Sequence, residues 1–257
     1  MNPVTPTVEI LGVRFARVPP EIALEHIEDL YESHDPAIVA HANVHTVNLA
    51  LADPGYMAAL QRADLVLNDG KGVMLAARMY GRPFPADLNG NFFTPLLLRR
   101  AAERGWPTFF FGARPGVARR AADRLREELP ALGIVGVRDG YARGEGCEVV
   151  DAIRASGAGL VLVGLGNPRQ ERWLVDNLAA TGARLGVGVG AFFDFQAGNV
   201  PRAPAWMNQV GLEWLHRLTV EPRRMWRRYL VGNPRFLARA TRERLSTGVR
   251  ADGVHAE

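Results

Sequence analysis

Residues Leu160–Leu174 read LVLVGLGNPRQERWL and combine an apolar run, a glycine turn and an amphipathic stretch. The apolar run is continuous, as in a strand that is buried on both faces. Gly164 and Gly166 come at its end, and Pro168 stands near the first helical position, where proline is favoured. The pattern predicts a strand at Leu160–Val163 that turns directly into a helix over Pro168–Thr181.

The same alternation of strand and helix extends over most of the chain. Further strands are expected near Val8–Val13 and at Ala37–Ala42, Ala63–Leu67, Thr108–Phe111, Ile134–Val137 and Leu185–Val189. Further helices are expected at Pro20–His34, Pro54–Gln61, Gly72–Met79, Phe92–Arg104, Pro115–Leu129 and Cys147–Ala155. Strands separated by such helices form βαβ crossovers. The predicted fold is therefore α/β, a Rossmann-like, mainly parallel sheet flanked by helices, with ligands beyond the carboxyl ends of the strands.

The pattern changes near Asn199, after which no strand is expected. Residues 1–200 are predicted to form the α/β body, and residues 201–246 an arginine-rich C-terminal helical appendage. From Trp206 to Arg250 ten arginines stand against three glutamates, which favours contact with phosphate groups. Residues 247–257 lack a periodic apolar face and are predicted to be disordered.

Composition excludes several classes of protein. The chain has 257 residues, of which 47% are hydrophobic and 23% charged, as in soluble globular proteins. The single Cys147 cannot form an internal disulfide. No apolar run is long enough to span a bilayer, and the first residues lack the features of a signal peptide. We therefore expect a cytoplasmic protein.

Polar residues follow the predicted strand at Ala37–Ala42, in the segment HANVHTVNLA. Thr46 and Asn48 carry hydroxyl and amide groups that suit a sugar or a phosphate. The same residue types commonly cap helices, so a purely structural cap is the alternative.

The segment ADLVLNDGKGV, Ala63–Val73, runs from a buried strand into Asn68, Asp69 and Gly70. A carboxylate at a strand exit can accept the proton of an attacking hydroxyl. Asn-Asp-Gly is also ordinary turn chemistry, which remains the alternative.

The turn Gly164–Gly166 lets backbone N–H groups approach a phosphate at a helix N-terminus. A dinucleotide fingerprint would need a third glycine where Arg169 stands, so an NAD or FAD enzyme is disfavoured and no cofactor is expected. Gln170 and Glu171 follow on the first helical turns, either facing the ligand or lying on a solvated face.

Asp194 lies among three phenylalanines at another strand exit. A carboxylate in such surroundings needs a partner, so it either caps a turn or faces the ligand. The histidines are scattered and no carboxylates cluster at ligand spacing, so no metal site is expected.

The segment VEPRRMWRRYL, Val220–Leu230, places arginines on one arc of a helix and apolar or aromatic residues on the other. Arg224, Arg227 and Arg228 belong to the basic arc. Such a helix suits an anionic membrane surface, or docking over a site that holds a diphosphate. A solvated basic face is the remaining alternative.

Taken in order, these segments resemble the WecG/TagA/CpsF family of bacterial glycosyltransferases. The resemblance runs from about Ala37 to Arg239 and rests on HTVN, LVLNDGKGV, VGLGNPRQERW, GVGAFFDFQAG, RAPAWMNQVGLEWLHRL and EPRRMWRRYLVGNP. It implies inverting, metal-independent transfer of a sugar from a UDP-sugar to a polyprenyl-diphosphate-linked saccharide. It also implies peripheral attachment to the inner face of the cell membrane, in the biosynthesis of exopolysaccharide, capsule, teichoic acid or common antigen.

The resemblance also implies roles for single residues. Asp69 would be the catalytic base, and Thr46, Asn48 and Gln170 or Glu171 would line the pocket. The turn Gly164–Gly166 would accept the diphosphate, and the arginines of the appendage would neutralise the departing UDP and touch the membrane.

One motif departs from the family, which usually has Arg where Asp87 stands and Asp where Phe92 stands. An anion beside a diphosphate weakens binding, because like charges repel most where water is excluded. Arg82 could compensate only if the loop folded differently. The departure favours an alternative function as a non-catalytic, membrane-peripheral scaffold, whereas the intact Asp69 favours the enzyme.

The basic appendage lacks any known nucleic-acid module, so no nucleic-acid partner is expected. A homo-oligomer is compatible with the sequence. The transferred sugar, the acceptor and the polymer are not determined by it.

Overall fold

The computed structural model describes residues 5–33, 35–140, 147–201, 207, 213–220 and 222–252. Its centre is a six-stranded sheet with the order β4-β3-β8-β7-β5-β6, and every neighbouring pair of strands is parallel. The strands are β3 (Ala37–Ala42), β4 (Leu65–Asn68), β5 (Thr108–Gly112), β6 (Ile134–Arg138), β7 (Leu160–Gly164) and β8 (Leu185–Gly188). The predicted Rossmann-like α/β fold is confirmed.

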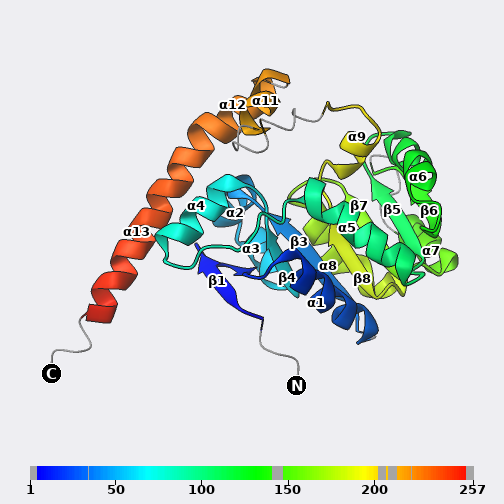
Figure 1. Cartoon of the computed structure of the whole chain (residues 1–257), viewed down its shortest axis with the longest axis horizontal. Helices are drawn as coiled ribbons and strands as arrows, with labels where there is room; N and C mark the ends of the chain where they lie inside the picture. Colours follow the sequence, from blue (N-terminus) through cyan, green and yellow to red (C-terminus); the bar gives the residue numbers. More distant parts are fainter. Residues whose placement is uncertain are drawn as a thin grey trace.

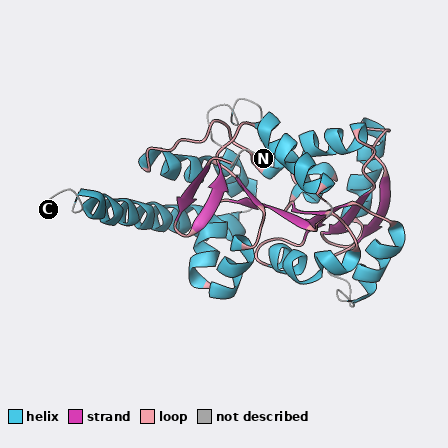
Figure 2. Cartoon of the chain, turned by 90° about the horizontal axis from the view of Figure 1, so that it is seen from below, coloured by secondary structure: helices cyan, strands magenta, loops and turns pink. Residues whose placement is uncertain are grey.

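Helices cover both faces of this sheet, as Figures 1 and 2 show. Those of the body are α1 (Pro20–Glu32), α2 (Val44–Ala52), α3 (Pro54–Gln61), α4 (Lys71–Met79), α5 (Gly90–Glu103), α6 (Val117–Glu128), α7 (Cys147–Ser156), α8 (Arg169–Thr181) and α9 (Phe192–Gln196). Within β7, Leu160 and Leu162 pack with residues of α1, α5 and α6, whereas Val161 and Val163 pack with residues of α7 and α8. Because successive side chains of a strand point to opposite faces, a continuous apolar run serves two cores at once.

The N-terminal segment differs from the single strand expected near Val8–Val13. It forms an antiparallel hairpin of β1 (Thr7–Ile10) and β2 (Val13–Ala16), with Ile10 opposite Val13. Leu11 and Gly12 form the turn, with φ values of 52° and 80°. Positive φ at both central positions is what a tight hairpin requires, and the sequence signal was weak because Leu rather than Asn or Gly occupies the first of them.

The described part of the appendage consists of α11 (Glu213–Val220), α12 (Pro222–Trp226), a π-helical segment η1 (Arg227–Gly232) and α13 (Asn233–Asp252). Helix α13 lies against α2 and α4 at one side of the body (Figure 1). Its Phe236 and Ala240 are completely buried there. Helix α13 is described as far as Asp252, and the disorder of residues 247–257 stays a prediction.

A single carboxylate joins α13 to the N-terminal hairpin. Glu243 accepts a hydrogen bond from the backbone N–H of Leu11 at 3.0 Å and another from the hydroxyl of Tyr80. The same hydroxyl lies 3.3 Å from the carbonyl oxygen of Ala240. The second half of the appendage is therefore fixed to the body.

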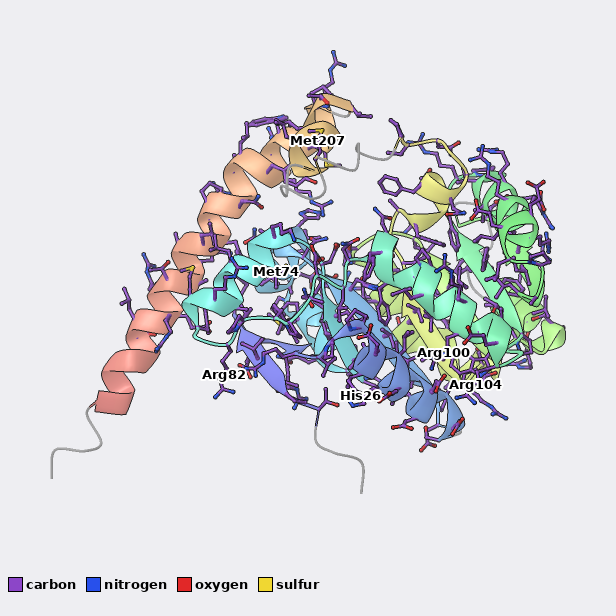
Figure 3. All side chains as sticks on the ribbon, viewed as in Figure 1. His26, Met74, Arg82, Arg100, Arg104 and Met207 are labelled. Atoms are coloured by element: carbon purple, nitrogen blue, oxygen red, sulfur yellow. The ribbon has the colours of Figure 1, made fainter. Side chains whose placement is uncertain are left out.

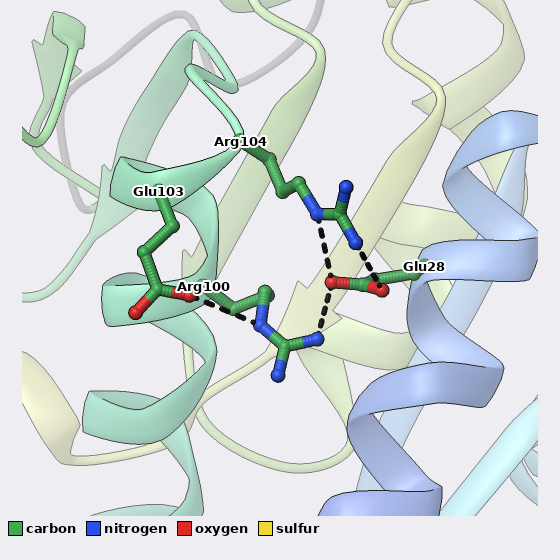
Figure 4. A network of polar contacts seen from close by, with 4 residues as sticks. All are labelled: Glu28, Arg100, Glu103 and Arg104. Carbon is green, nitrogen blue, oxygen red and sulfur yellow. Dashed lines mark hydrogen bonds and ion pairs between the residues drawn. The ribbon is translucent and has the colours of Figure 1, made fainter.

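An ion network fixes α5, whose first turn borders the cleft described below. Glu28 of α1 accepts hydrogen bonds from Arg100 and, at 3.1 and 3.2 Å, from Arg104 (Figure 4). Arg100 also contacts Glu103 at 3.3 Å. Burial by itself raises the pKa of Glu28, but the two guanidinium groups outweigh it and hold that pKa below its usual range.

Candidate active site

A cleft of about 900 Å³ opens over the carboxyl ends of β3, β4 and β8, beside the turn that follows β7. This is where ligands of open parallel sheets bind. Two groups of its lining residues differ in chemical character. We call Asn43, Asp69, Gly70, Lys71 and Asp87 the acidic wall, and Gly166, Asn167, Gln170 and Gly190 the amide wall.

Asp69 lies half-buried directly after β4 and lines the cleft, as predicted. Its Oδ2 accepts a hydrogen bond from Nδ2 of Asn43 at 2.7 Å. Oδ1 of Asn43 in turn accepts the backbone N–H groups of His45 and Thr46 at 3.0 and 3.1 Å, so Asn43 is the N-cap of α2. One side chain therefore both begins a helix and orients the carboxylate.

Thr46 and Asn48, predicted to line the pocket, are not in this cleft. Thr46 is completely buried, and its hydroxyl lies 3.2 Å from Oδ1 of Asn43, which it helps to orient. Asn48 donates to the carbonyl oxygen of Gly232 at 2.9 Å and lines a separate pocket of about 480 Å³ beside Trp226 and Arg227. Because the helix begins after Asn43, Val44 and His45 of its first turn still line the cleft, whereas Thr46 and Asn48 do not.

Asp87 enters the acidic wall from the segment before α5. Its Oδ1 accepts the backbone N–H of Gly70 at 3.0 Å, and its Oδ2 lies 3.6 Å from Nζ of Lys71, the only lysine of the chain. Gly70 has a φ of 91°, a conformation that favours glycine. Burial raises the pKa of Asp87, and the charge of Asp69 adds to that effect. Asp87 therefore holds the turn that carries Asp69.

Arg82 does not compensate for the missing cation. It is exposed at the end of α4 and points away from the body (Figure 3). Asn68, beside Asp69, is also outside the cleft: it is buried and donates to the carbonyl oxygen of Ala86 at 3.0 Å. Gly70, which follows Asp69, lines the cleft.

The amide wall is formed by the turns after β7 and β8. Gly166 and Gln170 line the cleft, as predicted, and Gln170 is 1% exposed. Glu171 is equally buried but lies behind them, outside the lining. The alternative of a solvated face is therefore wrong for both side chains. Gly164 does not line the cleft either; its Cα packs against Phe193, where a Cβ would come within 2.6 Å of the ring.

Asp194 does not reach the cleft. It lies on α9, and its carboxylate accepts a hydrogen bond from Nδ2 of Asn199 at 3.3 Å. The backbone N–H of Asn199 also bonds the carbonyl oxygen of Asp194 at 2.9 Å. Of the two alternatives, Asp194 closes a turn rather than faces a ligand.

The appendage completes the cleft. Met225, Arg228, Tyr229 and Asn233 line it, and the Arg228 guanidinium lies 5.7 Å from the centre of the Tyr229 ring. Arg227 points instead to the smaller pocket, where it lies 5.2 Å over the Trp226 ring. The side chain of Arg224 lies outside the described residues. One of the three predicted arginines is thus placed in the cleft.

His41 is a site residue that the sequence argument did not single out. It lies near the end of β3, lines the cleft, and its Nδ1 is 3.1 Å from the carbonyl oxygen of Gly188. A carbonyl can only accept, so Nδ1 carries the proton. Burial lowers the pKa of the imidazole, which is therefore neutral at pH 7. The sequence does contain a signal for this residue, because His41 is the one polar residue in the apolar strand AIVAHA.

Within the described part of the chain, no group of three or more His, Cys, Asp or Glu side chains is arranged to hold a metal ion. None of the helices in the described ranges is long and apolar enough to cross a membrane.

Residues 8–250 match the model of the glycosyl transferase WecG/TagA/CpsF family. The chain belongs to this family. Two relatives are similar to it over most of both sequences, and both are named N-acetylglucosaminyldiphosphoundecaprenol N-acetyl-beta-D-mannosaminyltransferase. The protein of Bacillus spizizenii is 34% identical over 208 residues, which are 80% of each chain. That of Bacillus subtilis strain 168 is 30% identical over 194 residues, 76% of this chain and 75% of the relative.

Asp87 and Phe92, the two positions at which the sequence departs from the motif of the resemblance, both line the cleft. Phe92 is 49% exposed. With Asp69 and Asp87, the acidic wall carries two carboxylates beside the single cation of Lys71.

Proposed function

We propose that this chain transfers a sugar from a UDP-sugar to a polyprenyl-diphosphate-linked saccharide, with inversion and without a metal ion, in the assembly of a cell-surface polysaccharide. The observation that carries the proposal is Asp69, a carboxylate oriented by Asn43 in the cleft of a WecG/TagA/CpsF member. The acceptor class is supported by the names of the two relatives, which act on a diphosphoundecaprenol-linked sugar.

The proposed reaction is a single displacement. The acceptor hydroxyl attacks the anomeric carbon of the donor while the bond from that carbon to the UDP oxygen breaks, and Asp69 takes the hydroxyl proton. Attack from the face opposite UDP inverts the anomeric configuration. Arg228, which reaches the cleft from η1, would stabilise the charge that develops on the departing diphosphate.

The test is an assay of the full chain with a panel of UDP-sugars and a lipid-linked acceptor that carries a diphosphate and one sugar. We expect transfer from one donor, with an inverted linkage detected by NMR. No transfer from any UDP-sugar, by protein that is shown to be folded, would contradict the proposal.

We also propose that the appendage holds the protein on the inner face of the cell membrane. Trp226 and Leu230 are 43% and 57% exposed on α12 and η1, beside Arg223 and Arg227. Each arginine near an anionic bilayer contributes about 1 kcal/mol, and salt screens that contribution. We expect the protein to pellet with anionic liposomes at low salt and to be released at high salt. Reversal of the charges at 223, 224, 227 and 228 should abolish the pelleting. Salt-insensitive pelleting would contradict the proposal.

A scaffold without catalytic activity is the second candidate, and Asp87 is the observation that favours it. A half-buried anion, where the resemblance implies a cation, opposes a diphosphate. Calorimetry with UDP separates the two functions, because a scaffold of this kind needs no nucleotide. Measurable UDP binding favours the transferase.

A further inference from the structure

A buried network of polar side chains lies behind the amide wall. Glu171 of α8 is 1% exposed, and its Oε1 accepts hydrogen bonds from Nδ2 of Asn167 at 2.6 Å and from Nε2 of Gln170 at 2.8 Å. Its Oε2 accepts the hydroxyl of Tyr56, from α3, at 3.2 Å. Asn167 and Gln170 line the cleft, whereas Glu171 and Tyr56 do not.

The carboxylate determines which way the Gln170 amide faces. Oε1 of Glu171 accepts a hydrogen bond both in the ionised carboxylate and in a carboxyl group that carries its proton on Oε2, so the NH₂ group of Gln170 points toward Glu171. Oε1 of Gln170 then faces the backbone N–H groups of Gly166 and Gly190, at 3.2 and 3.0 Å. A flipped amide would set its NH₂ against two N–H donors and its oxygen against a carboxylate. Only one orientation is compatible with Glu171.

Gln170 thereby joins two separate turns. Gly166 belongs to the turn after β7 and Gly190 to the turn after β8, and both have positive φ, 75° and 56°. The amide packs against Gly188 of β8, where a Cβ would come within 2.9 Å of Nε2 of Gln170. The close approach leaves the amide little room to move.

We propose that Glu171 is a positioning residue that orients Gln170, whose carbonyl oxygen clamps the turns after β7 and β8 and so fixes the amide wall of the cleft. Glu171 does not touch the substrate. The effect on turnover rests on the proposed function, because it requires a substrate in this cleft; the clamp itself does not.

The clamp is tested first without any substrate, by NMR-detected hydrogen exchange in the full chain. We expect the amide N–H groups of Gly166 and Gly190 to be protected in the wild type. In Glu171→Leu, which removes the acceptor, both should exchange at least about tenfold faster. The matched control is Tyr56→Phe, which removes the hydrogen bonds of the Tyr56 hydroxyl to Oε2 of Glu171 and to Nδ2 of Asn167 but leaves the bond between Gln170 and Oε1 of Glu171, and should leave both rates unchanged.

Two results would overturn the clamp. One is rapid exchange at both glycines in the wild type, a measurement that needs no variant to fold. The other is unchanged exchange in a folded Glu171→Leu. Glu171→Gln gives a further check, because its carbonyl oxygen can accept both NH₂ groups; protection should be kept, and its loss would mean that hydrogen bonding to Oε1 does not orient Gln170.

Kinetics then tests the consequence for transfer. With the UDP-sugar that supports turnover, Glu171→Leu should lower kcat/KM by roughly 10- to 100-fold, mainly through KM, because the wall would bind substrate in a less defined position. Glu171→Gln should recover most of the loss. An unchanged kcat/KM in Glu171→Leu would contradict the positioning role, whereas absence of transfer in the wild type would contradict the proposed function and leave the exchange result standing.

Discussion

The two walls of the cleft differ in the charge of the groups that line them. In the acidic wall the charged groups themselves line the cleft, and their partners are a capping asparagine, a glycine N–H and an exposed lysine. In the amide wall only neutral amides and glycine turns line the cleft, and the one carboxylate lies behind them. The two positions of a carboxylate therefore have different consequences. A carboxylate that lines the cleft can accept a proton from a ligand or repel its phosphate. A carboxylate behind the lining affects only the position of the groups that line the cleft.

The largest effect is expected on the acidic wall, for Asp69→Asn. An amide at this position can still accept from Asn43 but cannot take a proton, so turnover should fall by roughly two to four orders of magnitude with donor affinity nearly unchanged. Single-turnover kinetics and calorimetry measure the two quantities. Asp64→Asn is the matched control: Asp64 precedes the same strand and accepts the N–H of Ile38 at 2.8 Å, far from the cleft. Turnover of Asp69→Asn within threefold of wild type would remove it from the role of base.

The amide wall should also respond in stability, through Glu171. Burial raises the pKa of Glu171 from 4.5 to about 7. Below pH 4.5 the carboxyl holds its proton in both the folded and the unfolded protein; between pH 4.5 and 7 only the unfolded protein releases it, so the free energy of unfolding falls as pH rises. Between pH 4 and pH 8 wild type should lose about 3 kcal/mol relative to Glu171→Gln. Denaturant titrations at the two pH values measure this, and parallel behaviour of the two proteins would exclude a raised pKa.

A smaller effect is expected when the acidic wall is changed toward the pattern usual in the family. Asp87→Arg removes a repulsion and adds a partner for a diphosphate, so UDP should bind on the order of tenfold more tightly. Asp87→Asn keeps an acceptor for the N–H of Gly70 and removes only the charge, so its gain should be smaller. Weaker UDP binding by a folded Asp87→Asn would show that the carboxylate is not repulsive.

No effect is expected from chelation, although both walls contain oxygen ligands. If Arg228 and backbone N–H groups stabilise the departing UDP, transfer should proceed unchanged in EDTA. Restoration of a lost activity by added Mg²⁺ or Mn²⁺ would mean that a cation shares this task.

The sheet could be predicted from the sequence because its strands are short apolar runs with turn residues at their ends, and Ala37–Ala42 is an example in which the bounds agree. The residues of the cleft were harder to predict. In HANVHTVNLA the strand ends at Ala42 and the helix begins at Val44. Asparagine and threonine both commonly cap helices. The cap is Asn43, which lines the cleft, and Thr46, three residues later, is completely buried outside it. Glu171 could not be placed, because its partner Tyr56 is 115 positions away and only the fold brings the two together.

The bond between Leu11 and Glu243 has a consequence for the order of events during translation. The two residues are 232 positions apart. Protein synthesis adds about 5 to 20 residues per second, so Glu243 is made roughly 10 to 50 s after the hairpin. Arg228 and Tyr229, which complete the cleft, are also made in that final interval. A nascent chain therefore cannot complete the cleft before these residues are made, and its first hairpin waits longer still, until Glu243 is made.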